Sequence, residues 1–268
     1  MTYEGSIVRP PAVAGMFYPS AADVLAADVE RFVAEAPVYR GRPPRALIVP
    51  HAGYVYSGPI AGTAYAALRS ISKPVRRVVL LGPSHRVALK GVAAPDAHWL
   101  RTPLGDVEID EAALDGAGVP RNARAHAGEH SLEVQLPFLQ RTVPDAKLCP
   151  IVCGRAAPEE VGAVIESLWS DDAVVVVSSD LSHYLPYARG RAVDEDTSAR
   201  IVALDDDLDG ERACGFVGVR GLLWMARRKG LLGKLLDLRS SGDTAGPRDE
   251  VVGYGAFVFW DGSTAVLS

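Results

Sequence analysis

The chain has 268 residues, of which 48% are hydrophobic and 23% charged, and its formal net charge is −5. No apolar stretch reaches the 18 residues that indicate a membrane span, and the basic residues are scattered, so we expect neither a membrane span nor a nucleic-acid footprint. Residues 1–6 lack the features of a secretory signal, and three cysteines do not form a disulfide framework, so we expect a cytoplasmic protein.

The predicted elements alternate between helices and short apolar strands. In chain order, apolar spacing and breaker residues predict a helix over 20–36, a strand over 45–50, a helix that begins at Pro59, strands over 77–81 and 91–94, a helix over 131–141, a strand over 148–152, a helix over 158–169, a strand over 173–177, helices over 191–204 and 214–229, and a strand over 251–260. Ser20 and Ser131 are candidate N-caps. This alternation predicts a layered α/β fold. No low-complexity linker divides residues 1–268, so we predict one domain.

Three of the six histidines follow the ends of apolar strands. His51 comes after the strand over 45–50, His85 after the strand over 77–81, and His183 after the strand over 173–177. In an open α/β sheet, ligands collect outside the carboxyl ends of the strands. The repeated placement of a metal-binding and proton-moving residue at that edge predicts one metal-centred active site, although each histidine could instead serve its own loop. Asp180, three residues before His183, could orient it or share in proton transfer.

Two further segments carry candidate site residues. If Ser131 opens a helix, His130 and Glu133 lie near its N-terminal end, which favours negative charge and tends to face an active site. Cys214 stands where a helix is predicted to begin, and such a position lowers the pKa of a thiol and favours the metal-binding thiolate. Cys149 and Cys153 share one face of an apolar strand, and we expect them to be core thiols.

Two other interpretations follow from the residues. A Ser-His-Asp hydrolase could be assembled from Ser84, His183 and Asp180, although the sequence has no G-x-S-x-G elbow to present the serine. The remaining histidines, His98 and His126, lie in polar loops, and we expect them at the surface.

Taken together, the motifs resemble those of the Memo protein family, whose prokaryotic members are called AmmeMemoRadiSam system protein B. The matching segments occur in family order along nearly the whole chain: residues 9–18 (RPPAVAGMFY), 50–54 (PHAGY), 81–85 (LGPSH), 101–105 (RTPLG), 129–133 (EHSLE), 178–183 (SSDLSH) and 214–215 (CG). The resemblance implies a single-domain α/β/α fold with a central mixed sheet, similar to the class III extradiol non-haem iron dioxygenases. It also implies a functional link with a radical-SAM protein and an AMMECR-type protein.

The resemblance further implies a metal site. Carried over by motif, the ligands are His51, His85 and Cys214, and the cofactor is an iron or copper ion. Non-haem iron oxygenases favour two histidines and one carboxylate, whereas a thiolate favours softer metals such as Cu(I). If iron is bound, Asp180 or Glu133 could supply the carboxylate.

Three hypotheses follow. The first is a metal-dependent, dioxygenase-like redox enzyme acting on an unknown small molecule. In it, His183 and Asp180 handle protons, while His130 and Glu133 complete the polar wall of the pocket. The second is a non-catalytic module that binds a protein or peptide on the same scaffold, since a fold does not fix a function. The third is a metal-assisted hydrolase, in which the metal activates water and His183 handles the proton.

Overall fold

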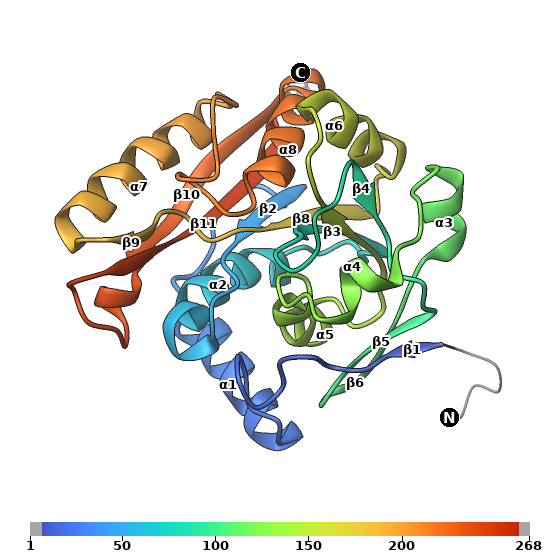
Figure 1. Ribbon diagram of the computed structural model, residues 1–268, viewed down its shortest axis with the longest axis horizontal. Helices are drawn as coiled ribbons and strands as arrows, with labels where there is room; N and C mark the ends of the chain where they lie inside the picture. Colours follow the sequence, from blue (N-terminus) through green and yellow to red (C-terminus); the bar gives the residue numbers. More distant parts are fainter. Residues whose placement is uncertain (1–6, 263–268) are drawn as a thin grey trace.

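A mixed β-sheet forms the centre of the computed structural model, which describes residues 7–262 (Figure 1). The sheet has eight strands in the order β10-β11-β2-β8-β3-β7-β4, with β9 paired to β11. These strands are β2 (Ala46–Val49), β3 (Arg77–Pro83), β4 (Val92–Ala93), β7 (Lys147–Cys153), β8 (Ala173–Ser178), β9 (His183–Leu185), β10 (Leu231–Ser240) and β11 (Val251–Asp261). The four central strands β2, β8, β3 and β7 are parallel, and the outer pairings are antiparallel.

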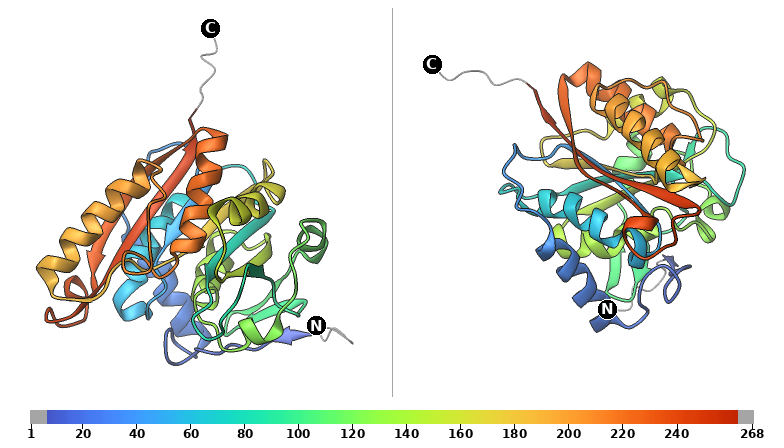
Figure 2. Two further views of the ribbon diagram at one scale, coloured as in Figure 1. Left: turned by 45° about the horizontal axis from the view of Figure 1, so that its top comes forward. Right: turned by 90° about the vertical axis from the view of Figure 1, so that its left-hand side faces the viewer.

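Helices cover both faces of this sheet (Figures 1 and 2). One face carries α1 (Ala22–Glu35), α2 (Tyr54–Arg69) and α5 (Leu136–Thr142), and the other carries α6 (Pro158–Ser167), α7 (Tyr187–Val202) and α8 (Phe216–Lys229). Beside them lie the short helices α3 (Glu111–Gly116) and α4 (Ala123–Ala127), the 3₁₀ turns η1 (Glu133–Gln135) and η2 (Ser241–Asp243), and a small sheet of β1 (Val8–Arg9), β5 (Trp99–Thr102) and β6 (Gly105–Glu108). The predicted α/β/α arrangement around a mixed sheet is confirmed.

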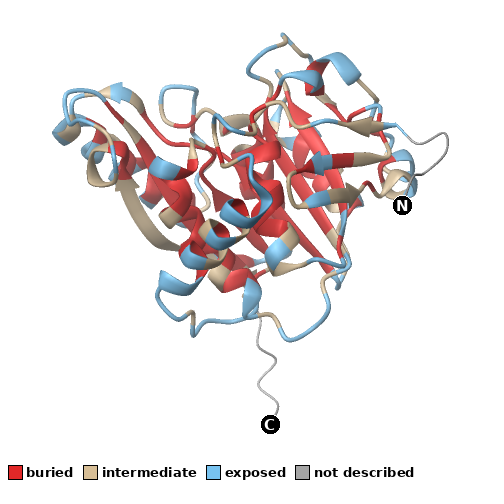
Figure 3. Cartoon of the chain, turned by 90° about the horizontal axis from the view of Figure 1, so that it is seen from below, coloured by how far each residue is buried: buried red, intermediate tan, exposed pale blue. Residues whose placement is uncertain are grey.

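The central strands are mostly apolar because both of their faces are covered. Every residue of β2 and of β8 is buried, which is typical of parallel strands between two helix layers. Figure 3 shows these buried strands between more exposed helices. In α1 the buried residues Leu25, Val29, Phe32 and Val33 recur at helical spacing and turn towards the core. The spacing that predicted this helix is therefore the spacing that packs it.

Several predicted helix starts are wrong, and the helix predicted from Arg191 begins earlier, at Tyr187. The helix predicted from Pro59 begins at Tyr54, so the proline lies inside α2. The carbonyl that loses its donor belongs to Val55, whose residue is 65% exposed, and water can replace the missing bond there. The N-cap of α1 is Ala21, without a side-chain cap bond, rather than Ser20. Ser131 opens no helix, because its hydroxyl donates to the carbonyl of Pro83, 3.0 Å away.

Within residues 7–262, no helix is both long enough and apolar enough to cross a membrane. Residues 1–6, on which the argument against a secretory signal was based, lie outside the described residues.

Candidate metal centre

The loops that follow β2, β3 and β8 meet at one edge of the sheet. These strands are neighbours and run parallel, so their carboxyl ends are side by side. His51 lies just past β2, His85 just past β3, and Asp180 just past β8. Of the three histidines expected to converge, His51 and His85 do so, with ring centroids 5.3 Å apart, whereas His183 is not part of the group and His130 takes its place.

His130 completes a group of three rings, which we call the His triad (His51, His85 and His130). One ligand nitrogen from each ring lies within 4.8 Å of the other two. His130 stacks on His85 with ring centroids 4.7 Å apart, and it meets His51 edge-on at 5.4 Å. His51 is buried, His130 partly buried and His85 exposed, so the group is open to solvent on one side. The His triad could hold a metal ion.

The hydrogen bonds of the Ser178 hydroxyl fix the tautomer of His51. Its Nδ1 lies 2.9 Å from the hydroxyl of Ser178. That hydroxyl donates its single proton to the carbonyl of Ser131 at 2.6 Å and accepts from the amide of Gln135 at 2.8 Å. It can therefore only accept from His51, so Nδ1 carries the proton and Nε2 presents its lone pair. Burial, assisted by His85, lowers the pKa of His51 to about 3, which keeps the ring neutral and able to bind a metal.

Glu129 fixes the tautomer of His85 in the same way. Its carboxylate accepts from Nδ1 of His85 at 2.9 Å and from the His85 amide at 2.6 Å, and it also accepts the amides of His130 and Ser131. Burial opposes ionisation of Glu129, but the hydrogen bonds from His85 and Ser131 outweigh it and lower its pKa to about 2. The carboxylate therefore holds Nδ1–H of His85 and leaves Nε2 free, an arrangement common around metal-ligating histidines.

His130 is held by packing rather than by a hydrogen bond to its ring. Phe17 contacts it with centroids 4.6 Å apart. Within the described residues, Nδ1 of His130 is buried and forms no hydrogen bond, and it lies 3.4 Å from a carboxylate oxygen of Glu129. Burial and the neighbouring His51 lower the pKa of His130 to about 4, so it too is neutral at physiological pH.

Cys214 lies beside the triad. Its sulfur is 3.3 Å from Nε2 of His51 and accepts the amide of Asp180 at 3.3 Å. The expected stabilisation of a thiolate by a helix N-terminus is wrong, because α8 begins two residues later at Phe216. Burial and the nearby carboxyl of Asp180 raise the pKa of the thiol. Cys214 is therefore a protonated thiol that faces the free nitrogen of His51, and a metal ion there would have to displace its proton.

Asp180 and His183 lie on the same side of the site. The carboxylate of Asp180 accepts the amides of His51 at 2.7 Å and Ala52 at 3.3 Å, so its hydrogen bonds fix the turn after β2 rather than the ring of His183. Burial raises the pKa of Asp180 against the opposing effect of those amides. His183 lies on β9, half-buried, and is near enough for its charge to perturb the pKa values of His51 and Asp180.

Glu133 lies one layer away from the rings. Its two oxygens accept four hydrogen bonds, from Arg9, Tyr18 and the amides of Ala12 and Val13. The Arg9–Glu133 ion pair, 2.7 Å long and nearly buried, ties the N-terminal segment that carries Phe17 to the loop that carries His130. The carboxylate thus supports the site through that segment.

Two glycines let the loops approach this closely. A Cβ on Gly82 would lie 2.7 Å from Oγ of Ser131, and a Cβ on Gly215 would lie 2.7 Å from the carbonyl oxygen of Ser178. Real Cβ atoms do not tolerate such distances. Gly82 therefore allows the His130 loop to pack on the end of β3, and Gly215 allows the Cys214 loop to pack on the end of β8.

Sequence reasoning missed the partners that orient the rings. Glu129 and Ser178 lie inside the motifs identified in the sequence, but the sequence alone does not indicate that they orient the histidines. The same is true of Gln135. A carboxylate next to His130 was the one available signal for Glu129. The pairing with His85 spans 44 residues and becomes visible only in the fold.

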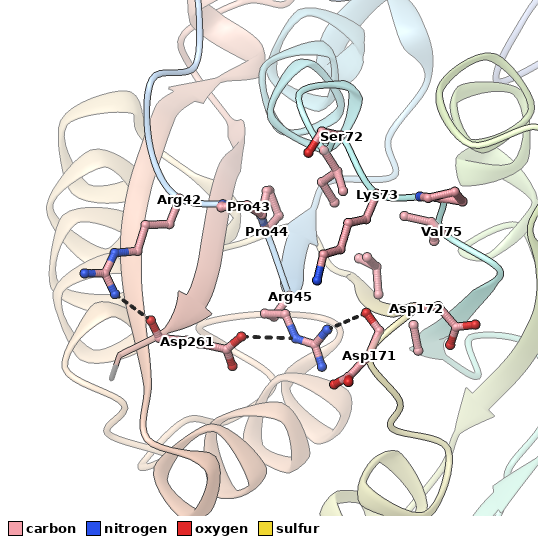
Figure 4. A pocket seen from close by; sticks show the side chains of 14 residues that line it. Arg42, Pro43, Pro44, Arg45, Ser72, Lys73, Val75, Asp171, Asp172 and Asp261 are labelled. Atoms are coloured by element: carbon pink, nitrogen blue, oxygen red, sulfur yellow. Dashed lines mark hydrogen bonds and ion pairs between the residues drawn. The ribbon is translucent and has the colours of Figure 1, made fainter. Parts of the chain in front are cut away.

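A second cavity, of about 420 Å³, lies at the opposite edge of the sheet, near the beginnings of β2 and β8 (Figure 4). It contains no histidine or cysteine, and its charges are mixed: Arg45 extends towards Asp261, and Lys73 points into the same space. Its carboxylates, Asp171, Asp172 and Asp261, do not form a close group of metal-ligating side chains, and within residues 7–262 the His triad is the group that does.

The fold and the triad define a class, an α/β protein with a potential metal site at the carboxyl edge of its sheet. The sequence matches the family described as Memo-like protein over residues 9–258. It is 36% identical over 277 residues to a MEMO1 family protein of Saccharolobus solfataricus, covering 92% of this chain and 97% of that one. It is 34% identical over 288 residues to a MEMO1 family protein of Sulfurisphaera tokodaii, covering 95% and 100%. The chain therefore belongs to the Memo-like family.

Proposed function

We propose that the chain is a metal-dependent redox enzyme that holds an iron or copper ion on the His triad and acts on a small molecule bound beside Cys214. The observation that carries this proposal is the orientation of the rings. His51 and His85 each have Nδ1–H committed to an acceptor, so their Nε2 lone pairs are available before any metal arrives. Ligands arranged in advance lose little conformational freedom when they bind an ion.

The donor set fits the proposed metals. Neutral imidazoles suit iron, copper and zinc alike. The sulfur of Cys214, 3.3 Å from Nε2 of His51, adds a soft donor next to them, which favours reduced copper and supports redox chemistry over hydrolysis. When bound, the ion would supply a Lewis-acidic, electron-accepting centre for the substrate.

The protein's own groups would position the reactants and move protons. Asp180 keeps the turn of His51 in place through the two amides it accepts. His183, half-buried on the same side, is the group we assign to proton transfer with the substrate, because its ring is not needed as a ligand by the triad. Ser178 and Glu129 hold the tautomers on which metal binding depends.

The expected setting follows from the same chemistry. All three cysteines are free, which agrees with a reducing compartment such as the cytoplasm. We retain the proposal that the chain works with a radical-SAM protein and an AMMECR-type protein.

The test is metal content, measured by elemental analysis on untagged protein after anaerobic loading with Fe(II) or Cu(I). We expect about one ion per chain in the wild type and loss of that ion in His51→Ala and His130→Ala. His98→Ala, which removes a ring outside the triad, is the matched control. Cys214→Ser separates the two ligand sets: retention supports the His triad, and loss supports the sequence-based set of His51, His85 and Cys214. Failure of the wild type to bind either ion would overturn the proposal and favour a non-catalytic binding module.

A further inference from the structure

A cavity of about 570 Å³ opens next to Cys214, on the side away from His51's strand. It lies between the loop that follows β3, the end of β7 and the first turn of α8, all of which meet near the carboxyl edge of the sheet (Figure 1). Ser84, the residue before His85, and Cys214 both line it. The cavity therefore reaches the thiol beside the His triad, although no ring of the triad lines it, and its volume is in the range of small-molecule sites.

All the charged residues that line this cavity are positive. Its charged lining residues are Arg155 and Arg220, and no carboxylate lines it in the described part of the chain. Within residues 7–262 neither guanidinium forms an ion pair, whereas neighbours on the same face do, as Arg228 does with Glu166. Arg155 is exposed at the rim, and Arg220 is half-buried. We call this space the Arg155–Arg220 cavity.

Arg220 is the inner arginine of the cavity. It is half-buried, and within residues 7–262 its Nε is closed off from solvent without a hydrogen-bond partner. A ligand in the cavity would therefore meet the terminal nitrogens of the guanidinium, for which the described residues supply no carboxylate. A guanidinium prefers a carboxylate or phosphate group, which it can bind through two parallel hydrogen bonds.

The rest of the lining agrees with an anion that has an apolar body. The amides of Val217 and Gly218 lie in the first turn of α8, where the helix itself offers no acceptor and the dipole favours negative charge. Val87, Leu89 and Phe216 supply apolar surface on the other walls. A small organic anion would place its charged group on the arginines and its body against these side chains.

We propose that the Arg155–Arg220 cavity binds the carboxylate or phosphate group of the substrate and so directs the substrate's body towards Cys214 and the His triad. This inference rests on the proposed function, because it assigns the substrate of that site to the class of small organic anions. Arg220 is the inner anchor and Arg155 the outer one. Both arginines are substrate-binding residues.

The experiment is a calorimetric titration of the metal-free full-length chain with benzoate, with phenyl phosphate, and with neutral benzamide as the matched probe. We expect one saturable site for at least one of the two anions and at least tenfold weaker binding of benzamide. Whichever anion binds more tightly identifies the carboxylate or the phosphate as the preferred group. Arg220→Gln and Arg155→Gln should each weaken anion binding about tenfold, the loss expected for one charge-assisted hydrogen bond.

Arg76→Gln is the matched control, because Arg76 is an exposed arginine at the opposite edge of the sheet, just before β3. It should leave the affinity unchanged. Since Arg155 is exposed, its variant keeps the test informative even if Arg220→Gln unfolds, which circular dichroism would reveal. Absence of saturable anion binding, or binding that both substitutions leave intact, overturns the inference. Using the metal-free chain keeps the two proposals apart: metal uptake without anion binding removes this inference alone, and anion binding without metal uptake removes the proposed redox centre alone.

Discussion

Replacing Glu129 with glutamine tests whether second-layer hydrogen bonds prepare the metal site. The carboxylate accepts four hydrogen bonds between 2.6 and 2.9 Å long, and two of them come from His85. A glutamine side chain has the size of glutamate, but its amide nitrogen is a donor. That nitrogen would face N–H groups that now donate to the carboxylate of Glu129. Nδ1 of His85 would then lose its fixed proton acceptor, and Nε2 would no longer be reserved for the metal.

The magnitude follows from the pKa of Glu129. Burial opposes ionisation, but hydrogen bonds from His85 and Ser131 lower the pKa from 4.5 to about 2. A shift of that size corresponds to about 3 kcal/mol of folding free energy at neutral pH. Because the folded-state pKa is the lower one, this stabilisation is complete above about pH 4.5 and is lost as the pH falls towards 2. We expect Glu129→Gln to unfold about 3 kcal/mol more easily at pH 7 and to bind metal about 10- to 100-fold more weakly.

Two assays measure these effects: urea unfolding of the metal-free protein, and competition for Zn(II) against a chromophoric chelator. Glu133→Gln is the matched control, since Glu133 is equally buried, also accepts four hydrogen bonds, and contacts no histidine of the triad. It should destabilise the fold, because it leaves the charge of Arg9 uncompensated, and it should lower Zn(II) affinity less than Glu129→Gln does, because it acts on the triad only through the segment that carries Phe17. The reasoning is refuted if Glu129→Gln binds Zn(II) as the wild type does, or if both variants lose affinity equally.

Three further predictions use other parts of the structure. Ser178→Ala removes the acceptor of Nδ1–H of His51 and should lower Zn(II) affinity about tenfold in the same chelator assay, with wild-type affinity contradicting the assigned tautomer. Burial lowers the pKa of His126 to about 4, so as the pH falls below 6.5 the unfolded state binds the proton of His126 before the folded state does. The free energy of unfolding should therefore drop by about 2 kcal/mol between pH 7 and 5. In urea titrations, His126→Gln should remove this part of the pH dependence of the unfolding free energy. Gly215→Ala should cost about 1–3 kcal/mol because its Cβ meets the backbone of β8, whereas Gly116→Ala, whose Cβ meets nothing within 4 Å, should leave the urea midpoint nearly unchanged.

The position of the site was predictable because it depends on strand direction alone. The alternation of helices and apolar strands indicated an open α/β sheet, and in such a sheet residues that follow strand ends, as His51 and His85 do, collect at one edge. The inward face of α1 followed from its spacing for a similar reason. These features depend only on the spacing of apolar residues and on the fold class. Both can be inferred from the pattern of residues within short stretches of the sequence.

The environment of individual polar groups was not predictable in this way. His126 was expected at the surface because its loop is polar, yet it is 3% exposed and its Nε2 meets the carbonyl of Ala93. The thiol of Cys214 was expected to have a lowered pKa, and burial raises it. In both cases tertiary contacts decide the outcome, and their partners lie 33 or more residues away in the sequence.

The loop that carries Cys214 connects the two proposed sites physically. On one side its sulfur faces Nε2 of His51, and on the other side it lines the Arg155–Arg220 cavity. Gly215 lets this loop pack closely on the end of β8, next to Ser178 and Ser179. A substrate anchored by Arg220, which lies about one helical turn into α8, would therefore extend along the helix start towards Cys214 and the triad. The order of arginine, thiol and histidines along this edge gives the bound molecule a direction, with its anionic end on the helix and its reactive end at the metal ligands.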